Sequence, residues 1–106
     1  MNRFLLYGKL VKDAERILIN TKTGDTTLIN FQVLDAGMPY QKSDPLIMDV
    51  SFLKEAGNHI FEYLKEGKEV YIDGFMKQKT YKSKGEDVKK YYLAAEYVGL
   101  LPMYKN

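Results

Sequence analysis

The sequence lacks several residue types on which whole classes of function depend. It has no cysteine and no tryptophan, and His59 is the only histidine among its 106 residues. A disulfide scaffold and a thiolate metal site are therefore excluded, which fits a cytoplasmic protein. No residue at metal-ligand spacing accompanies His59, so we expect neither a metal nor another cofactor.

Long hydrophobic runs and a strong net charge are also absent. No apolar run approaches the ~18 residues of a membrane helix, and the short run after Arg3 is broken by Gly8 and Lys9. We therefore expect no signal peptide and no membrane partner. The formal net charge is only +2, so affinity for a polyanion has to come from local clusters of basic residues.

Catalytic motifs are missing as well. Asp49, Ser51 and His59 are close together in the sequence, but no orienting motif surrounds them, and proximity along the chain does not make a catalytic triad. Glu86 and Asp87 are typical of a turn rather than of a general acid and base. The chain is therefore predicted not to be an enzyme.

Alternating apolar and polar residues indicate a chain built mainly of strands. Hydrophobic residues make up 45% of it and charged residues 28%, which is typical of one globular domain over residues 1–106, with about residues 103–106 flexible. The period-2 pattern predicts strands at residues 4–11, 26–34, 46–53, from 68 onwards and 88–101, and residues 17–19 form a further short apolar run. Gly8 and Gly74 fall inside these strands and predict bends or bulges.

One helix is predicted, between Lys54 and Glu66. Ala56, Ile60 and Leu64 are four residues apart, and Gly67 follows as a stop signal. Strands with a single helix between the third and fourth favour an all-β fold, a five-stranded OB-fold barrel in which the helix closes one end. A ferredoxin-like fold would need a second helix, which the sequence does not supply.

The strongest functional signal lies in residues 68–90, KEVYIDGFMKQKTYKSKGEDVKK. The segment begins as an apolar strand, but beyond Gly74 it becomes basic with one aromatic residue, before a turn near residues 83–87. Lysines can follow a phosphate backbone, and an aromatic ring can stack on any base. The alternative is a solvated hairpin whose lysines only discourage edge-to-edge aggregation. The residues concerned are Lys77, Lys79, Tyr81, Lys82 and Lys84.

Two segments carry a family resemblance. MNRFLLYGKLVKDAE, residues 1–15, resembles the opening strand of bacterial single-stranded DNA-binding proteins, and EYLKEGKEVYIDG, residues 62–74, resembles the end of their helix and their fourth strand. The spacing between the two segments also agrees, and the resemblance extends to about residue 102.

The resemblance implies a set of nucleic-acid-binding residues. Arg3 occupies the place of a basic residue near the DNA path, and Lys77 and Lys79 match basic residues of the fourth strand. Tyr81 and Tyr40 match aromatic residues that stack on bases. The alternative for each is an ordinary half-buried sheet residue, and for Tyr40 the two interpretations are about equal. Further lysines of the same loop and hairpin complete the set: Lys42, Lys82 and Lys84.

The chain also departs from the family pattern. Ile47 stands where many members have a stacking tryptophan, and Leu53 where many have a phenylalanine; the adjacent Phe52 should point to the opposite face of its strand. Typical members continue to an acidic tip that recruits replication and repair proteins. The sequence ends in LLPMYKN without such a tip, so recruitment of replication proteins by that route is not expected.

Two hypotheses on function follow. The first is binding of single-stranded DNA, or RNA, without sequence specificity, in DNA replication, recombination and repair. The second is an OB-fold module that acts mainly through protein contacts, similar to primosomal accessory proteins or to phage and mobile-element variants with weak DNA affinity. The resemblance also implies a homo-oligomer, dimer or tetramer, paired through residues 4–7, although a monomer could cover this strand with its own chain.

Overall fold

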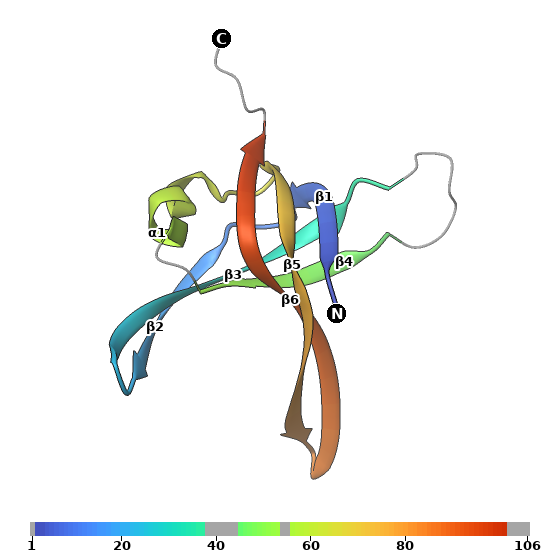
Figure 1. Cartoon of the computed structure of the whole chain (residues 1–106). Coiled ribbons are helices and arrows are strands. Elements are labelled where there is room, and N and C mark those ends of the chain that lie inside the picture. Colours follow the sequence, from blue (N-terminus) through green and yellow to red (C-terminus); the bar gives the residue numbers. More distant parts are fainter. Residues whose placement is uncertain (1, 38–44, 54–55, 102–106) are drawn as a thin grey trace.

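The computed structural model describes residues 2–37, 45–53 and 56–101, and this part of the chain contains six strands and one short helical segment (Figure 1). In chain order the elements are β1 (Phe4–Leu10), β2 (Glu15–Thr21), β3 (Gly24–Asp35), β4 (Ile47–Phe52), α1 (Ala56–Ile60), the 3-10 turn η1 (Phe61–Tyr63), β5 (Glu69–Ser83) and β6 (Glu86–Leu101).

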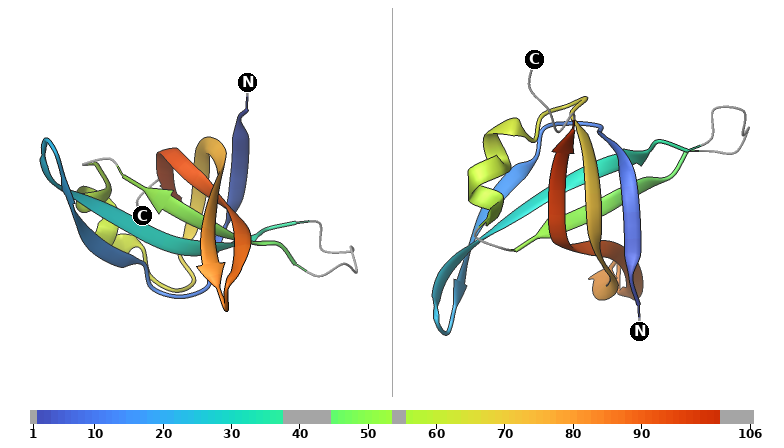
Figure 2. Two further views of the ribbon diagram at one scale, coloured as in Figure 1. Left: turned by 90° about the horizontal axis from the view of Figure 1, so that it is seen from below. Right: turned by 45° about the horizontal axis from the view of Figure 1, so that its top comes forward.

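The six described strands form one sheet that closes on itself through β1. The order is β1-β5-β6-β4-β3-β2, and β1 also pairs with β3. Five strands, β1, β5, β6, β4 and β3, are thus joined in a ring, and β2 is added at the edge of β3. Among the described strands, β4 and β6 are parallel and the other pairs antiparallel. Figure 2 shows β1, β5 and β6 side by side, crossing β3 and β4.

Gly8 is the position where β1 changes partners. It is paired with Val70 of β5 on one side and with Asp35 of β3 on the other. A Cβ atom at this position would lie 2.0 Å from the carbonyl oxygen of Leu34. The two backbones can therefore approach closely only if the residue is glycine.

Gly74 marks a second irregularity, in β5. The pairing between β5 and β6 shifts by one residue between Asp73 and Gly74. A Cβ at Gly74 would lie 2.2 Å from the carbonyl oxygen of Ala94. The bulge predicted from this glycine is therefore confirmed.

The core lies inside the ring and follows the alternation of the strands. Ile29, Phe31 and Val33 of β3 are buried, as their period-2 spacing predicted. Strands β1, β4, β5 and β6 contribute in the same way, since each alternates buried and outward-facing positions over part of its length, whereas β2 contributes no buried side chain. The largest fully buried side chains are Leu10, Ile29, Val33, Val50, Leu64, Val70, Ile72 and Leu93.

The predicted strand count has to be corrected. The sequence predicted five strands with the helix after the third, whereas the described residues contain six, with α1 after the fourth. The short run noted at residues 17–19 is part of a full strand, β2, which pairs along its length with β3 and lies outside the ring of five.

The helix is also much shorter than the predicted span Lys54–Glu66. It covers Ala56–Ile60 and then tightens into the 3-10 turn η1. The reason is tertiary: Leu64 is fully buried in the core, and its carbonyl accepts a hydrogen bond from the Ala14 N–H at 2.9 Å. This contact replaces helical hydrogen bonding, since packing overrides a helical propensity that Gly57 already weakens. Among the described residues, no helix has the length and apolarity to cross a membrane.

Replacing Gly8 by alanine tests the close approach of β1 and β3. The added methyl group would overlap backbone atoms of β3, so that one of the two strands would have to shift. We expect Gly8→Ala to lower the free energy of unfolding by about 1–3 kcal/mol, measured by urea unfolding. Lys9→Ala, at the next and exposed position of β1, is the control. Equal stability of Gly8→Ala and wild type would contradict this account.

Candidate nucleic-acid interface

The distal halves of β5 and β6 form a hairpin that projects from the ring (Figure 1). Ser83 is paired with Glu86, so the turn contains only Lys84 and Gly85, whose φ angles are 53° and 82°. Positive φ at both central residues is the signature of a type I′ turn, which favours a regular two-stranded ribbon. The turn sets the register of the pairs that follow it.

This register divides the hairpin into two faces, because successive side chains of a strand point to opposite sides. Lys77 is opposite Tyr92, Lys79 opposite Lys90, and Tyr81 opposite Val88. We call the side that carries these residues the groove face: Lys77, Lys79, Tyr81, Val88, Lys90 and Tyr92. The opposite side carries Gln78, Thr80, Lys82, Asp87, Lys89 and Tyr91.

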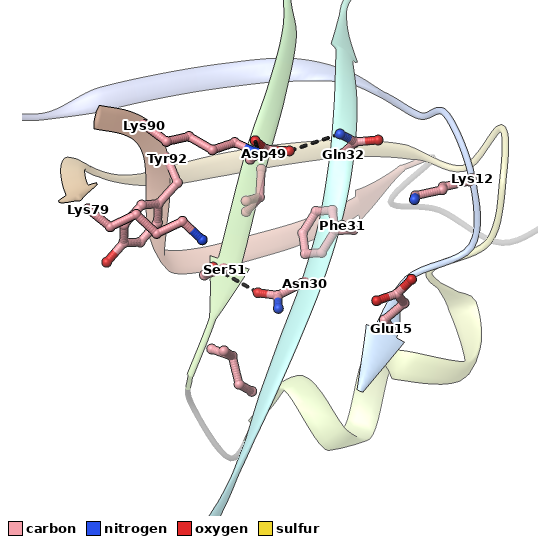
Figure 3. A pocket seen from close by; sticks show the side chains of 12 residues that line it. Lys12, Glu15, Asn30, Phe31, Gln32, Asp49, Ser51, Lys79, Lys90 and Tyr92 are labelled. Carbon is pink, nitrogen blue, oxygen red and sulfur yellow. Dashed lines mark hydrogen bonds and ion pairs between the residues drawn. The ribbon is translucent and has the colours of Figure 1, made fainter. Parts of the chain in front are cut away.

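A groove with a volume of about 410 Å³ lies where the groove face meets the outer surface of β3 and β4 (Figure 3). Lys79, Lys90 and Tyr92 reach it from the hairpin, and Lys12 and Glu15 lie at its other side. Its remaining lining comes from the middle of β3 and β4: Leu28, Asn30, Phe31, Gln32, Asp49, Val50 and Ser51.

The floor of the groove carries two side-chain hydrogen bonds between neighbouring strands. The Gln32 Nε2 atom donates to Asp49 Oδ1 at 2.9 Å, and the Ser51 hydroxyl donates to Asn30 Oδ1 at 2.8 Å (Figure 3). In each case the two residues are directly opposite in the β3–β4 register. The polar groups of the floor are thus held in a fixed arrangement before any ligand binds.

An ion pair links the floor to the hairpin. Lys90 Nζ lies 2.9 Å from Asp49 Oδ2, and the ammonium group of Lys79 lies 5.7 Å from the centre of the Tyr92 ring. Partial burial raises the pKa of Asp49, but hydrogen bonds from Lys90 and Gln32 outweigh this effect and lower it below the ordinary 3.8. The same hydrogen bond with Asp49 raises the pKa of Lys90. Both groups are therefore charged at neutral pH.

The structure brings together only part of the predicted binding set. Lys77, Lys79 and Tyr81 share the groove face of the hairpin. Lys82 is on the opposite side, where its Nζ is 3.9 Å from Asp87 Oδ1, and Lys84 lies in the turn.

The remaining predicted residues lie elsewhere. Arg3 precedes β1 and forms an ion pair with Asp73 of β5. Tyr40 and Lys42 lie outside the described residues.

Ile47, at the start of β4, and Leu53, directly after its end, are the two departures from the family pattern, and both are exposed. Ile47 is 51% and Leu53 54% exposed, and Asp49 and Ser51 occupy the intervening outward positions. Phe52 points into the core, with 3% exposure. The expectation that Phe52 cannot replace an aromatic residue at position 53 is therefore confirmed.

Several groove residues were not among the predicted ones. Lys90 and Tyr92 could have been found, because a two-residue turn at Lys84 and Gly85 places them opposite Lys79 and Lys77. The floor residues of β3 and β4 give no such signal, since their place beside the hairpin depends on the distant pairing of β4 with β6. Among the described side chains, no three of His, Asp or Glu gather so that they could hold a metal ion.

Fold and groove together define a class: a small β protein with a basic and aromatic groove across a ring of strands. The model of the "Single-strand binding protein family" matches residues 1–101. The chain belongs to this family, as the resemblance of its two segments predicted.

Two similar proteins illustrate the relationship. The chain is 31% identical over 81 residues to a single-stranded DNA-binding protein of Onion yellows phytoplasma (strain OY-M), covering 76% of this chain and 74% of that protein. It also resembles a chain of the solved structure described as "Plasmodium falciparum SSB complex with ssDNA", with a TM-score of 0.81 and 14% identity over 95% of both chains. At this identity the second likeness is one of fold.

The ion pair between Asp49 and Lys90 predicts a pH dependence of stability. Because the pKa of Asp49 is lowered on folding, its stabilising contribution is present above about pH 4 and is lost as the pH falls through the folded-state pKa. We expect the stability advantage of wild type over Asp49→Asn to shrink below that pH in urea unfolding. Ser51→Ala, which removes no titratable group, should differ from wild type by a constant amount. An Asp49→Asn difference that is independent of pH would refute this prediction.

Proposed function

We propose that this protein binds single-stranded DNA without sequence specificity. The observation that carries the proposal is the gathering of Lys77, Lys79, Tyr81, Lys90 and Tyr92 on one face of a hairpin, beside an open groove. Membership of the single-strand binding protein family supports the same function. The family also supports a role in DNA replication, recombination and repair.

In the proposed complex the strand follows the groove face. Lys77 and Lys79 contact phosphates, and Tyr81, which is 47% exposed, offers a free ring face for a base. Tyr92 is partly buried beneath the ammonium group of Lys79 and forms part of the wall. A duplex keeps its bases stacked and paired, so it cannot use Tyr81, and this accounts for the selectivity for single strands.

The ring of strands supports assignment to the OB fold as a single domain. In the OB fold, the first strand pairs with two others and thereby closes a small barrel, and the nucleic-acid groove crosses the barrel's outer surface. The dual pairing of β1 and the position of the groove over β3 and β4 agree with both features.

Exposed aliphatic residues at positions 47 and 53 lower the expected affinity. A stacked base contributes about 1–3 kcal/mol, and Ile47 and Leu53 can replace this only by apolar contact. The same exposed pair favours a second candidate function, in which the outer face of β4 contacts another protein and DNA binding is weak. A titration with DNA decides between the two.

Self-association is supported by an apolar patch on the outer side of β1, β5 and β6. Leu5 is 56% exposed, Tyr7 45%, Tyr71 36% and Tyr97 50%. Strand pairing places these side chains near one another. Tyr7 of β1 is directly opposite Tyr71 of β5, and Leu5 and Tyr97 are directly opposite Asp73 of β5 on its two sides. We propose that a second copy of the chain covers this patch, giving a dimer or a larger oligomer.

A fluorescence anisotropy titration of labelled oligo-thymidine, with a duplex of equal length for comparison, tests DNA binding. We expect selective binding of the single strand, with an affinity that falls as salt rises, by a logarithmic slope of about 0.7 per phosphate contact. Tyr81→Ala should weaken binding by about 1–3 kcal/mol at low and moderate salt alike, because stacking is not screened.

Tyr91→Ala is the matched control, since Tyr91 is 60% exposed on the opposite side of the same hairpin. It should leave the affinity nearly unchanged. If wild type binds neither DNA even at low salt, the proposed function is wrong and protein contacts become the leading candidate. Equal losses for both tyrosine variants would argue against the groove face as the binding surface.

The oligomeric state is tested with a charge in the apolar patch. Leu5→Asp should shift the mass measured by light scattering toward that of a monomer, because a buried carboxylate without a partner is costly. Leu18→Asp, at a leucine of β2 that is 67% exposed outside the patch, should keep the wild-type mass. A wild-type protein that is monomeric at high concentration would rule out this interface.

A further inference from the structure

The lysines of the groove face are not equivalent, because Lys90 is already engaged by a carboxylate. Its Nζ lies 2.9 Å from Asp49 Oδ2, at ideal distance for a charge-assisted hydrogen bond. Asp49 comes from β4, whereas Lys90 comes from β6, so the ion pair crosses the groove between its floor and its wall (Figure 3). Any strand in the groove has to pass this pair.

The carboxylate is held firmly in this position. Its second oxygen, Oδ1, accepts the hydrogen bond from the Gln32 amide at 2.9 Å, and Gln32 is directly opposite on β3. Lys79, directly opposite Lys90 on the hairpin, is close enough for its charge to act on Asp49 as well. One negative charge is thus held at Lys90 and within electrostatic reach of Lys79, on the wall of the groove.

We propose that Asp49 occupies the position of a DNA phosphate at Lys90 and thereby limits the affinity for single-stranded DNA. This inference rests on the proposed function. When DNA binds, either Lys90 stays with Asp49 and takes no part, or the ion pair opens and leaves the carboxylate beside a phosphate. Both outcomes cost affinity, because the first loses a contact and the second places like charges together.

A different role would give the opposite result. If Asp49 served to orient Lys90 toward the DNA, its removal would weaken binding. The sign of the change in affinity on replacing Asp49 therefore separates a competitor for the lysine from a positioning residue.

The test is the same oligo-thymidine titration with Asp49→Asn, which keeps the size of the side chain and can still interact with Gln32. We expect three- to tenfold tighter binding at about 50 mM salt. If Lys90 stays with Asp49 in the wild-type complex, the logarithmic salt slope should also become steeper by about 0.7, since Lys90 then gains a phosphate and releases one more counterion; if the ion pair opens in wild type, only the affinity should rise. Thermal unfolding confirms that the variant is folded.

Two further variants show whether the gain comes from Lys90. Asp87→Asn makes the same change in net charge on the opposite side of the hairpin, where Asp87 is paired with Lys82, and it should tighten binding much less. In the double variant Asp49→Asn with Lys90→Gln, the gain in affinity and any extra salt slope should disappear, because the lysine released from Asp49 is gone.

The outcomes separate this inference from the proposed function. If wild type binds the single strand and Asp49→Asn binds it equally or more weakly, the role of Asp49 is overturned and DNA binding stands. If Asp49→Asn and Asp87→Asn tighten binding equally, the gain comes from the change in net charge alone, and the proposed role of Asp49 is also overturned. If neither wild type nor Asp49→Asn binds at low salt, both proposals fail.

Discussion

The closure of the ring at β1 is the constraint on which the rest of the structure depends. At Gly8 the strand passes from one partner to another, and the backbone hydrogen bonds from Leu10 N–H to Lys68 and from Val11 N–H to Gln32 extend this double attachment. Without it, β3 and β4 would be joined to β5 and β6 through the short parallel pairing at Val50 and Ser51. The groove lies across that junction, so its shape depends on the closure.

The hairpin projects from this closed ring because the regular pairing of β5 with β6 continues beyond the residues that pair with other strands. The bulge at Gly74 changes the register where the strands leave the ring, and the type I′ turn at Lys84 and Gly85 fixes it again from the other end. Between the bulge and the turn the register is regular, so each side chain is assigned to one of the two faces of the hairpin. Tyr81 and Lys79 therefore lie on the groove side and Tyr91 on the other, although all three are exposed.

The sequence predicted those features of the fold that depend only on residues close together in the chain. The alternation of β3, the interior glycines and the hairpin turn all follow from the two-residue period of strands and from the φ angles open to glycine. Leu64 could not be placed in this way, because its burial in the core ends a helix that spacing alone would continue. The floor of the groove was missed for the same reason, since Asp49 meets Lys90 only through the long-range pairing of β4 with β6.

The position of Asp49 also has a structural explanation that concerns the free protein. Lys79 and Lys90 are directly opposite on one face of an antiparallel pair, where like charges repel. The Asp49 carboxylate of β4, which pairs with Lys90 and attracts Lys79, offsets this repulsion when no DNA is present. A phosphate could do the same in the proposed complex, but in the free protein the Asp49 carboxylate does so. The stability of the free hairpin and the affinity of the groove therefore place opposite demands on the residue at position 49.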